Sequence, residues 1–460
     1  MASSCVYGLD VSSLERILTP GSYIGNITTV PRWSEFKAPQ PQIVVHPATE
    51  QDLQTTVKWA VDNDIPFLAQ SGGNGWATTF TIDQTGIIIA LDLLRSVTFS
   101  VDRKLVTIGG GALISDVIAS ASQNSALVTT GTCDCVGALG AILGGGIGFL
   151  TGEYGLGVDN VVSMNVILAD GSLRKVTESS SPDLFWALRG AAPNFGIVAS
   201  AVLRSYPVES SSSLEAWQGA LIYTPAQLDL VLGAISELAL TSQMALSMTW
   251  ILASNGTPSI IVSVFYHGTE AAGRSAFSSL IAIGPVVDAT KIVQYTEWNA
   301  GTKMACIKGG RKPTWGVGML HLDPASWHAV YDVWVRLGQE PGAERSSVLL
   351  TAYPMDKARQ LPVSSSSYPF RDSVYLFASF TASYTDAAFD ETALTYGTSA
   401  RALWQAADGL AHHSTYINNG FGDESSSTIY GASLPRLKVL KKQYDPEGRF
   451  SQWFPIETLP

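Results

Sequence analysis

The sequence is poor in charge, and the charge that it has is mostly acidic. Only 15% of the 460 residues are Asp, Glu, Lys or Arg, and 39 acidic side chains outnumber 28 basic ones for a net charge of −11. No long basic run occurs, so the electrostatic footprint of a protein that binds nucleic acid or an anionic membrane is missing. Because 46% of the residues are hydrophobic, we expect a large buried core instead.

Cysteine and metal-binding patterns are also scarce. The four cysteines are Cys5, Cys133, Cys135 and Cys306, and only Cys133 and Cys135 lie close together in the chain. This spacing predicts neither a disulfide framework nor a zinc site, because paired C-x-x-C motifs are absent. The six histidines include no H-E-x-x-H motif. We therefore expect no metal centre.

Long apolar runs are absent as well. No uninterrupted apolar stretch reaches the roughly 18 residues of a membrane span, and the N-terminus lacks the basic and apolar segments of a signal peptide. These absences predict a cytoplasmic protein with no membrane partner. Secretion stays open, since a leader can be missing from the sequence and two N-x-[ST] sequons occur, at Asn26 and Asn255.

Glycine, in contrast, is abundant, and its 42 residues gather in clusters. The segment QSGGNGW, Gln70–Trp76, follows the apolar run Ile65–Leu68. Glycine lets a ligand approach the main chain, and successive backbone N–H groups bind phosphate oxygens, so this loop can cradle a diphosphate. A tight turn between two buried strands would explain the same residues.

The two common nucleotide-binding motifs do not account for these clusters. The P-loop pattern G-x-x-x-x-G-K-[ST] is absent. The segment Gly144–Gly152 lacks the third glycine of a G-x-G-x-x-G motif at the required offset, and a hairpin follows it where a βαβ unit is needed.

The order of the predicted elements indicates an α+β fold. A helix capped by Thr49 precedes the strand that ends at the glycine loop, and Asp170-Gly171 predicts the turn of a hairpin. A short helix begins at Ser181 and stops at Gly190. Beyond residue 207, glycine becomes rarer, and strands rich in aromatic residues alternate with helices. We predict three parts: residues 1–207, residues 208–410, and a C-terminal segment 411–460 that returns to the first domain.

Five segments, in this order and spacing, resemble those of a known family. They are ATEQDLQTTVKWAVDNDIPFLAQSGGNG, GTCDCVGALGAILGGGIGFLTGEYGLGVDN, LFWALRGAAPNFGIV, YPFRDSVY and the tail YINN…YG…RLKVLKKQYDP. The chain is similar to the FAD-linked oxidases with the vanillyl-alcohol-oxidase fold, in their berberine-bridge-enzyme-like branch. Among these it resembles fungal members that are similar to 6-hydroxy-D-nicotine oxidase. The resemblance implies a two-lobed PCMH-type FAD-binding domain at 1–207 and a substrate-binding domain at 208–410, with an antiparallel sheet covered by helices.

The resemblance also implies the residues that hold FAD. The loop Gln70–Ala77 would wrap the diphosphate, and the glycines after Cys133 would pass under the flavin ring and the ribityl chain. Tyr416 and Asn418 match a Y-x-N-Y motif near the ring, with Asn419 in place of the second tyrosine. The expected cofactor-binding residues are Gln70, Ser71, Gly72, Gly73, Asn74, Gly75, Trp76, Cys133, Val136, Gly137, Gly140, Gly145, Gly146, Gly148, Asp159, Gly196, Ile197, Val198, Tyr416 and Asn418.

Covalent attachment of the flavin differs from the family pattern. Many relatives carry a histidine at the position of Asn74, which bonds to the flavin, and an asparagine cannot form that link. Cys133 fits the second tether, a cysteine in the pattern G-x-C-x-x-V-G, and a thiolate is nucleophilic enough to add to the ring. A cysteinyl link through Cys133 and a non-covalent FAD both stay open, because Cys133 and Cys135 also suit a buried turn.

The catalytic residues are the least defined. Plant relatives carry a glutamate on the strand after the segment Tyr368–Arg371, where this chain has Ser379, which is too weak a base. Tyr416, if its pKa is lowered, and Tyr353 are the candidate catalytic residues. Asp356 is expected in a solvated turn and His321 on the surface. Three aromatic residues could line a pocket, although aromatic residues on strands usually belong to the core: Trp250, Trp315 and Phe377.

The resemblance predicts an FAD-dependent oxidase of a small apolar or aromatic secondary metabolite, with dioxygen as the second substrate. A hydride would pass to the flavin, and dioxygen would leave as hydrogen peroxide, in an alcohol oxidation, a dehydrogenation or an oxidative cyclisation. The alternatives are a non-redox isomerase or pericyclase on the same scaffold, and a carbohydrate- or flavin-binding protein without catalysis. We expect a monomer or a homodimer.

Overall fold

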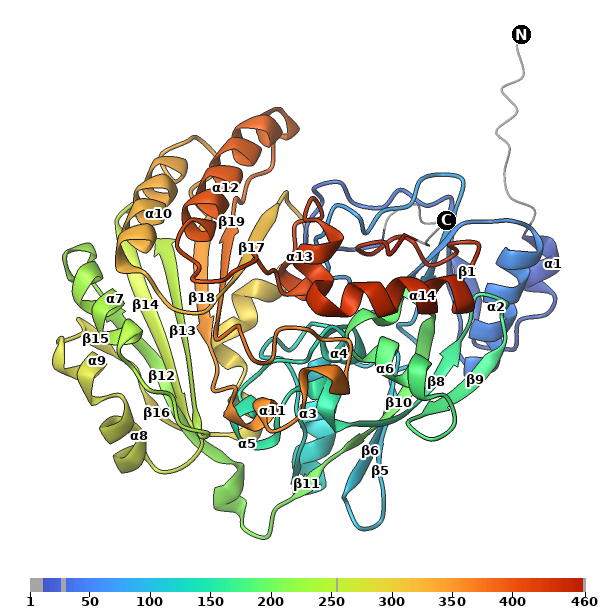
Figure 1. The fold of residues 1–460 in the computed structure, drawn as a ribbon, viewed down its shortest axis with the longest axis horizontal. Helices are drawn as coiled ribbons and strands as arrows, with labels where there is room; N and C mark the ends of the chain where they lie inside the picture. Colours follow the sequence, from blue (N-terminus) through green and yellow to red (C-terminus); the bar gives the residue numbers. More distant parts are fainter. Residues whose placement is uncertain (1–10, 26–29, 254, 458–460) are drawn as a thin grey trace.

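Two lobes lie side by side in the computed structural model of the protein (Figure 1). The structure describes residues 11–25, 30–253 and 255–457, so Cys5 and the sequon at Asn26 lie outside the described residues. Within these residues, no helix is both long and apolar enough to cross a membrane.

A small sheet opens the N-terminal lobe and delivers the glycine loop. Its strands, in sheet order, are β1 (Tyr23–Gly25), β2 (Ile43–His46), β4 (Ile87–Ala90) and β3 (Phe67–Gln70). β2, β4 and β3 are parallel, and β4 is buried along its whole length, as is typical of a strand covered on both faces. The helix α2 (Glu50–Asp62) begins after Thr49, whose hydroxyl accepts a hydrogen bond from the Asp52 N–H, which confirms the predicted cap.

A five-stranded antiparallel sheet forms the other half of this lobe. Its strands, in sheet order, are β5 (Val97–Phe99), β6 (Leu105–Gly109), β10 (Ile197–Arg204), β8 (Val161–Ile167) and β9 (Leu173–Thr177). β8 and β9 form the predicted hairpin, and Gly171 lies in its turn with a φ of 73° that favours glycine.

Short helices connect these strands. They are α3 (Ile114–Gln123), α4 (Ala138–Ile142), α5 (Thr151–Tyr154) and α6 (Pro182–Ala191). Gly190, at a φ of 146°, breaks the helical geometry of α6 where the sequence predicted its end. Ser181 precedes α6 as predicted, but its side chain makes no capping hydrogen bond.

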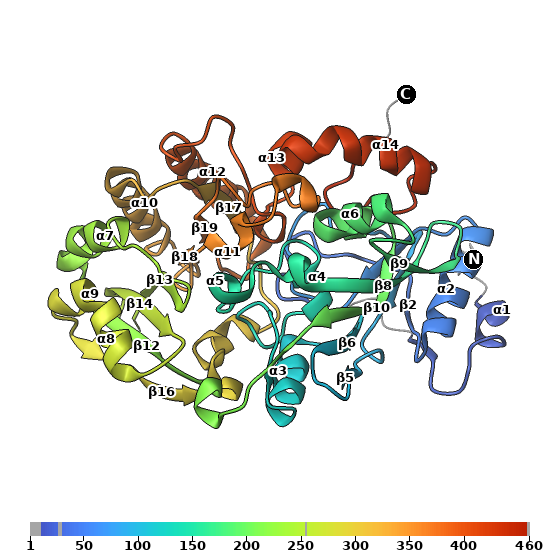
Figure 2. The ribbon, with the colours of Figure 1, turned by 60° about the horizontal axis from the view of Figure 1, so that its bottom comes forward.

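The second lobe is a large antiparallel sheet. Its strands, in sheet order, are β15 (Val287–Asp288), β12 (Glu215–Tyr223), β14 (Pro258–Tyr266), β13 (Met244–Leu252), β18 (Ser347–Ala352), β19 (Leu376–Thr381) and β17 (Thr314–Met319), and β16 (Lys291–Gln294) also pairs with β12. Helices lie on the face turned away from the N-terminal lobe (Figures 1 and 2). They are α7 (Leu228–Ser236), α8 (Glu270–Ala276), α9 (Ser278–Ala282), α10 (Pro324–Leu337) and α12 (Asp390–Gln405).

Tryptophans fill the layer between this sheet and its helices. Trp250 of β13 packs against Trp327 and Trp334 of α10, and all three are fully buried. A Cβ atom on Gly397 of α12 would lie 2.1 Å from the Trp315 ring, so Trp315 also points toward the helices. Of the two places left open for Trp250 and Trp315, the structure shows the core and not a pocket, because alternation along their strands turns both toward the helices.

The C-terminal segment returns to the N-terminal lobe, where α14 (Leu434–Tyr444) packs against α6 and α13 (Ser426–Tyr430) packs against α14 (Figure 1). Lys441 of α14 is buried, and its ammonium donates hydrogen bonds to the carboxylate of Asp445 at 2.6 Å and to the carbonyls of Asn194 and Phe450. Burial lowers the pKa of Lys441, and the charge of Asp445 opposes that shift. This ion pair fixes the chain that follows α14.

Replacing Asp445 by asparagine is predicted to destabilise the protein. The change keeps the shape but leaves the buried Lys441 charge without its carboxylate, which costs about 3–5 kcal/mol. Urea titration followed by tryptophan fluorescence measures the loss. The control is Asp183→Asn, which removes the exposed ion pair of Asp183 with Arg436 and should cost about 0–1 kcal/mol. Equal midpoints for the two variants would contradict the prediction.

Candidate functional site

The loop Gln70–Trp76 presses its backbone against a second glycine-rich segment. A Cβ atom on Gly72 would lie 2.6 Å from the Gly137 nitrogen and 2.7 Å from the Cys135 carbonyl oxygen. A Cβ on Gly137 would in turn lie 2.5 Å from the Ser71 hydroxyl. Gly73 has a φ of 73°, which other residues rarely adopt. Only glycine fits at these positions, and the two segments form one wall.

A cavity of about 160 Å³ lies beside this wall. Five of the predicted cofactor residues line it: Ser71, Gly140, Gly196, Ile197 and Val198. The remaining lining is mostly apolar and comes from β3, α4 and the C-terminal segment, including Phe450, Gln452 and Trp453. The structure thus brings segments that are distant in the sequence around one cavity.

Two unpaired polar atoms mark the polar side of the glycine loop. The Ser71 hydroxyl and the Trp76 indole N–H are buried, and neither has a hydrogen-bond partner among the described residues. Buried polar groups are normally satisfied, but the indole N–H groups of core tryptophans such as Trp250 and Trp327 are also unpartnered, so the Ser71 hydroxyl, which lines the cavity, is the more specific of the two. On Gly140, a Cβ would meet nothing within 4 Å, so the backbone there is open to an approaching group. An elongated ligand with an anionic, hydrogen-bond-accepting centre fits this arrangement.

Two cations adjoin the loop, and the sequence analysis missed both. Arg32 is 6% exposed, and its guanidinium donates hydrogen bonds to Gln70 Oε1 at 2.9 Å and to the Gly75 carbonyl. Burial lowers the pKa of Arg32 to about 10. The Lys308 ammonium donates to the Pro31 carbonyl at 3.1 Å. Neither cation pairs with a carboxylate of the described chain, and no local motif around Arg32 signals this position.

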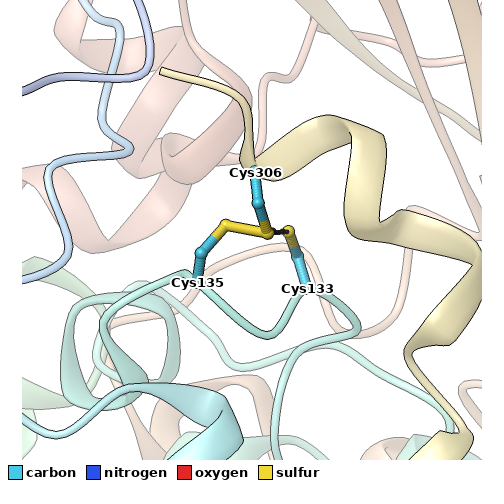
Figure 3. A group of neighbouring side chains, drawn as sticks. All are labelled: Cys133, Cys135 and Cys306. Atoms are coloured by element: carbon cyan, nitrogen blue, oxygen red, sulfur yellow. Dashed lines mark hydrogen bonds between the residues drawn. A yellow bond between two sulfur atoms is a disulfide. The ribbon is translucent and has the colours of Figure 1, made fainter.

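Three cysteine sulfurs meet at the edge of the same wall (Figure 3). Cys135 forms a disulfide with Cys306, across 171 residues of sequence. The expectation that the cysteines provide no disulfide is therefore corrected, because the fold brings a distant segment of the second lobe onto the 133–135 turn. Cys133 keeps its thiol, and burial raises its pKa. The amide of Asn74 lies 3.6 Å from Cys135 Sγ.

The two candidate tyrosines lie near each other at the interface of the lobes. The Tyr416 hydroxyl accepts hydrogen bonds from the Gly146 N–H at 3.2 Å and from the Asn418 amide at 2.7 Å. Burial raises the pKa of Tyr416 to about 12. Burial also raises the pKa of Tyr353 to about 12, although the Thr132 side chain opposes that shift. A lowered pKa at Tyr416 is thus contradicted, and at neutral pH both phenols are protonated.

Several residues that we expected to bind the cofactor make close contacts with other segments of the protein. The carboxylate of Asp159 accepts two hydrogen bonds from the Arg371 guanidinium, at 2.8 and 3.0 Å, and both side chains are buried. A Cβ on Gly145 would lie 2.9 Å from the Tyr416 ring, and one on Gly148 would lie 2.0 Å from the Thr130 carbonyl oxygen. Gly146 approaches Gly157, and the carbonyl of Val136 accepts the Ile114 N–H. Contact of these residues with FAD stays a prediction.

The strand β19 turns one row of side chains toward the N-terminal lobe. Phe377 is buried and lies with its ring 5.6 Å from that of Tyr416, and its place in a substrate pocket stays a prediction. Ser379 is on the same face two residues later and is 7% exposed. Asp356 is exposed at the start of α11 (Asp356–Arg359), and His321 is exposed as well, as the sequence predicted.

Comparison with known proteins gives one description throughout. A family model described as an FAD binding domain matches residues 41–177. The FAD-linked oxidoreductase OXR1 of Pyricularia oryzae is 33% identical over 433 residues, which are 91% of this chain and 84% of that protein. The FAD-linked oxidoreductase hasG of Aspergillus fumigatus is 33% identical over 439 residues, which cover 91% of this chain and 92% of hasG.

Solved structures show the same fold at lower identity. Xylooligosaccharide oxidase from Myceliophthora thermophila has a TM-score of 0.80 at 23% identity and covers 94% of this chain and 95% of its own. For 6-hydroxy-D-nicotine oxidase from Arthrobacter nicotinovorans the TM-score is 0.79 at 22% identity, over 95% of this chain and 98% of that chain. BBE-like 1 of Physcomitrella patens has a TM-score of 0.83 at 17% identity, with coverage of 97% and 99%. These likenesses confirm the predicted fold.

Gly72→Ala is predicted to weaken FAD binding. The new methyl group would clash with the backbone of Cys135 and Gly137 and push the loop away from the wall. We expect the dissociation constant of FAD to rise at least about tenfold, or ~1.4 kcal/mol. Titration of the apoprotein with FAD, followed by flavin fluorescence, measures the change.

Gly233→Ala is the matched control, since a Cβ on Gly233 of α7 meets nothing within 4 Å. Alanine in a helix should also leave the folded state at least as stable as glycine does. If both variants bind FAD like the unmodified chain, the loop does not hold the cofactor.

Proposed function

The chain belongs to the fungal FAD-linked oxidoreductases, and from this premise we propose that it oxidises a small apolar or aromatic secondary metabolite, with dioxygen as the final electron acceptor. The observation that carries the proposal is the cavity beside the glycine wall, with the unpartnered Ser71 hydroxyl and two cations at its loop. The names of the relatives favour this function over the non-redox isomerase or pericyclase.

The residues of the glycine wall suit the diphosphate of FAD. The Ser71 hydroxyl and the Trp76 indole N–H would each donate a hydrogen bond, and the bare backbone of the loop would supply further N–H groups. Arg32 is a positioning residue, because it holds Gln70 and Gly75 from behind. When bound, FAD supplies the acceptor for the substrate hydride and the reaction with dioxygen.

The tyrosines would orient the substrate or donate a proton to it, and they would not remove a proton from it. With pKa values raised to about 12 by burial, Tyr416 and Tyr353 carry their protons at neutral pH. The Gly146 and Asn418 groups that donate to Tyr416 fix its oxygen, and its hydroxyl donates to the Ala141 carbonyl at 3.5 Å. A proton released by the substrate would therefore pass to water or to the substrate's own groups.

Three finer points complete the proposal. Asn74 cannot carry a histidyl link, so a covalent bond to FAD would use Cys133, and otherwise FAD binds non-covalently. Dioxygen and one small molecule are the proposed partners, and the protein acts as a monomer or a homodimer. The Cys135–Cys306 disulfide favours secretion over the cytoplasm, because disulfides persist in oxidising compartments.

The purified protein is predicted to be yellow and to consume oxygen with a suitable substrate. Hydrogen peroxide should form in equal amount to the oxygen consumed. Colour that survives acid precipitation shows a covalent flavin, and its loss in Cys133→Ala would assign the link. A product that forms without oxygen uptake would contradict the oxidase and support the isomerase.

Tyr416→Phe is predicted to lower kcat about tenfold, equivalent to ~1.4 kcal/mol, with little change in FAD content. The change removes the acceptor of the Gly146 N–H and one of the two acceptors of the Asn418 amide, and it removes the phenol group from the proposed site. Tyr396→Phe on α12 is the control, since its hydroxyl contacts only Glu340 among the described residues. Equal kcat values for the two variants would remove Tyr416 from the reaction.

The localisation has its own test at Asn255. This residue is exposed in a turn, within the sequon Asn255-Gly256-Thr257. We expect the protein recovered from a fungal secretory pathway to carry an N-glycan there, so that endoglycosidase lowers its mass and Asn255→Gln removes one site. Recovery from the cytoplasm with Cys135 and Cys306 both reduced would contradict secretion.

A further inference from the structure

The three sulfurs form a cluster, and the disulfide within it has no part in the proposed oxidation. Cys133 Sγ lies 3.6 Å from Cys135 Sγ and 3.6 Å from Cys306 Sγ, which are bonded to each other (Figure 3). All three side chains are partly buried. A free thiol in van der Waals contact with both sulfurs of a disulfide is the arrangement from which thiol–disulfide exchange starts.

We propose that Cys133, Cys135 and Cys306 form an internal exchange set, in which Cys306 pairs with either Cys135 or Cys133. In the exchange, the Cys133 thiolate attacks Cys306 Sγ, the Cys133–Cys306 bond forms and the Cys135–Cys306 bond breaks. The electron pair of the broken bond leaves on Cys135, which takes up a proton, while the proton of Cys133 goes to solvent. One thiol and one disulfide are present before and after, so no oxidant or reductant is consumed.

The segment that carries Cys306 remains in place without its disulfide. We call residues 299–312 the strap, because they run from the 132–135 turn to the N-terminal segment. The Asn299 amide donates to the Asp134 carboxylate at 3.0 Å, and the Thr302 hydroxyl donates to the Thr132 carbonyl at 2.9 Å. Two main-chain bonds hold its other end, from Gly309 N–H to the Arg32 carbonyl and from Glu35 N–H to the Gly310 carbonyl. Cys306 therefore stays within reach of both cysteines when its bond breaks.

The resting geometry favours the Cys135–Cys306 pair. Cys133 lies equally far from the two bonded sulfurs, so it sits beside their bond, and an attack along the bond axis needs a rotation of the side chain. Burial also raises the pKa of the Cys133 thiol and keeps it protonated. Exchange is thus slow, and the second pairing is a minor form.

The consequence for the flavin rests on the proposed function. With Cys133 bonded to Cys306, the thiol expected to form the cysteinyl link is blocked. The exchange releases the Cys135 thiol instead. Its sulfur lies 3.6 Å from the amide of Asn74, which stands where many relatives carry the histidine that bonds to the flavin. The pairing of Cys306 therefore decides which thiol faces the cofactor.

Disulfide mapping of Cys135→Ser tests the exchange set. The full-length protein is equilibrated in a glutathione buffer, quenched with acid, alkylated and digested. Fragmentation of the linked peptides in a mass spectrometer then shows whether Cys133 or Cys135, which flank Asp134, is bonded to Cys306. We expect Cys135→Ser to form Cys133–Cys306 in the buffer in which the unmodified chain forms Cys135–Cys306. Cys133→Ser is the control and should keep Cys135–Cys306. If Cys133 and Cys306 of Cys135→Ser are both alkylated in that buffer, the proposal is wrong.

The unmodified chain provides the test if Cys135→Ser does not fold. Over a series of glutathione ratios, both links should be trapped from one preparation, and a single Cys135–Cys306 link at every ratio would overturn the exchange. The mapping needs no flavin, so it stays readable if the protein is not an oxidase. In the FAD-loaded protein, the acid-stable yellow colour of Cys135→Ser should fall in proportion to the fraction of molecules that carry the Cys133–Cys306 disulfide.

Discussion

The close contact between the backbones of Gln70–Trp76 and Cys135–Gly137 is the constraint on which the site depends. A side chain at Gly72 would clash with the backbone of Cys135 and Gly137, and a side chain at Gly137 would clash with Ser71. The contact brings the Ser71 hydroxyl, which lines the cavity, next to the Cys135–Gly137 segment. Arg32 then fixes the loop from the opposite side, through Gln70 and Gly75. This wall is the part of the site that we propose holds the diphosphate of FAD.

The second lobe is joined to this wall by polar contacts that are mostly buried. Arg371 reaches across the interface to Asp159, and both groups are removed from solvent, so the pair is costly to break from one side. The strap adds the Asn299 and Thr302 hydrogen bonds and the disulfide of Cys306. The C-terminal segment closes the opposite end of the cavity, where Lys441 holds the Phe450 carbonyl. The site thus lies between segments that are close in space and distant in sequence.

Local features of this fold could be predicted, since they depend on neighbouring residues. The Thr49 cap, the strand before the glycine loop and the Gly171 turn follow from side-chain chemistry and backbone geometry alone. The overall fold and the FAD cofactor were predicted from the order and spacing of segments that resemble a known family. The periodicity of apolar residues would not have indicated either. The Cys135–Cys306 bond and the buried Arg32 could not be predicted, because nothing near them in the sequence specifies a partner. The sequence could not decide between pocket and core for Trp250, because strand alternation shows which residues share a face, and tertiary packing decides which face is turned to the helices.

The absence of a base on β19 limits the kind of substrate that the site suits. The row of this strand that is turned toward the N-terminal lobe reads Phe377, Ser379 and Thr381, and none of these side chains can accept a proton at neutral pH. The two tyrosines hold their protons through burial, since removing water from a phenol penalises its anion. Oxidation here therefore favours a substrate whose own group is acidic, or a C–H bond next to a nitrogen or an extended π-system that stabilises positive charge. A simple alcohol would need a base that this row does not provide.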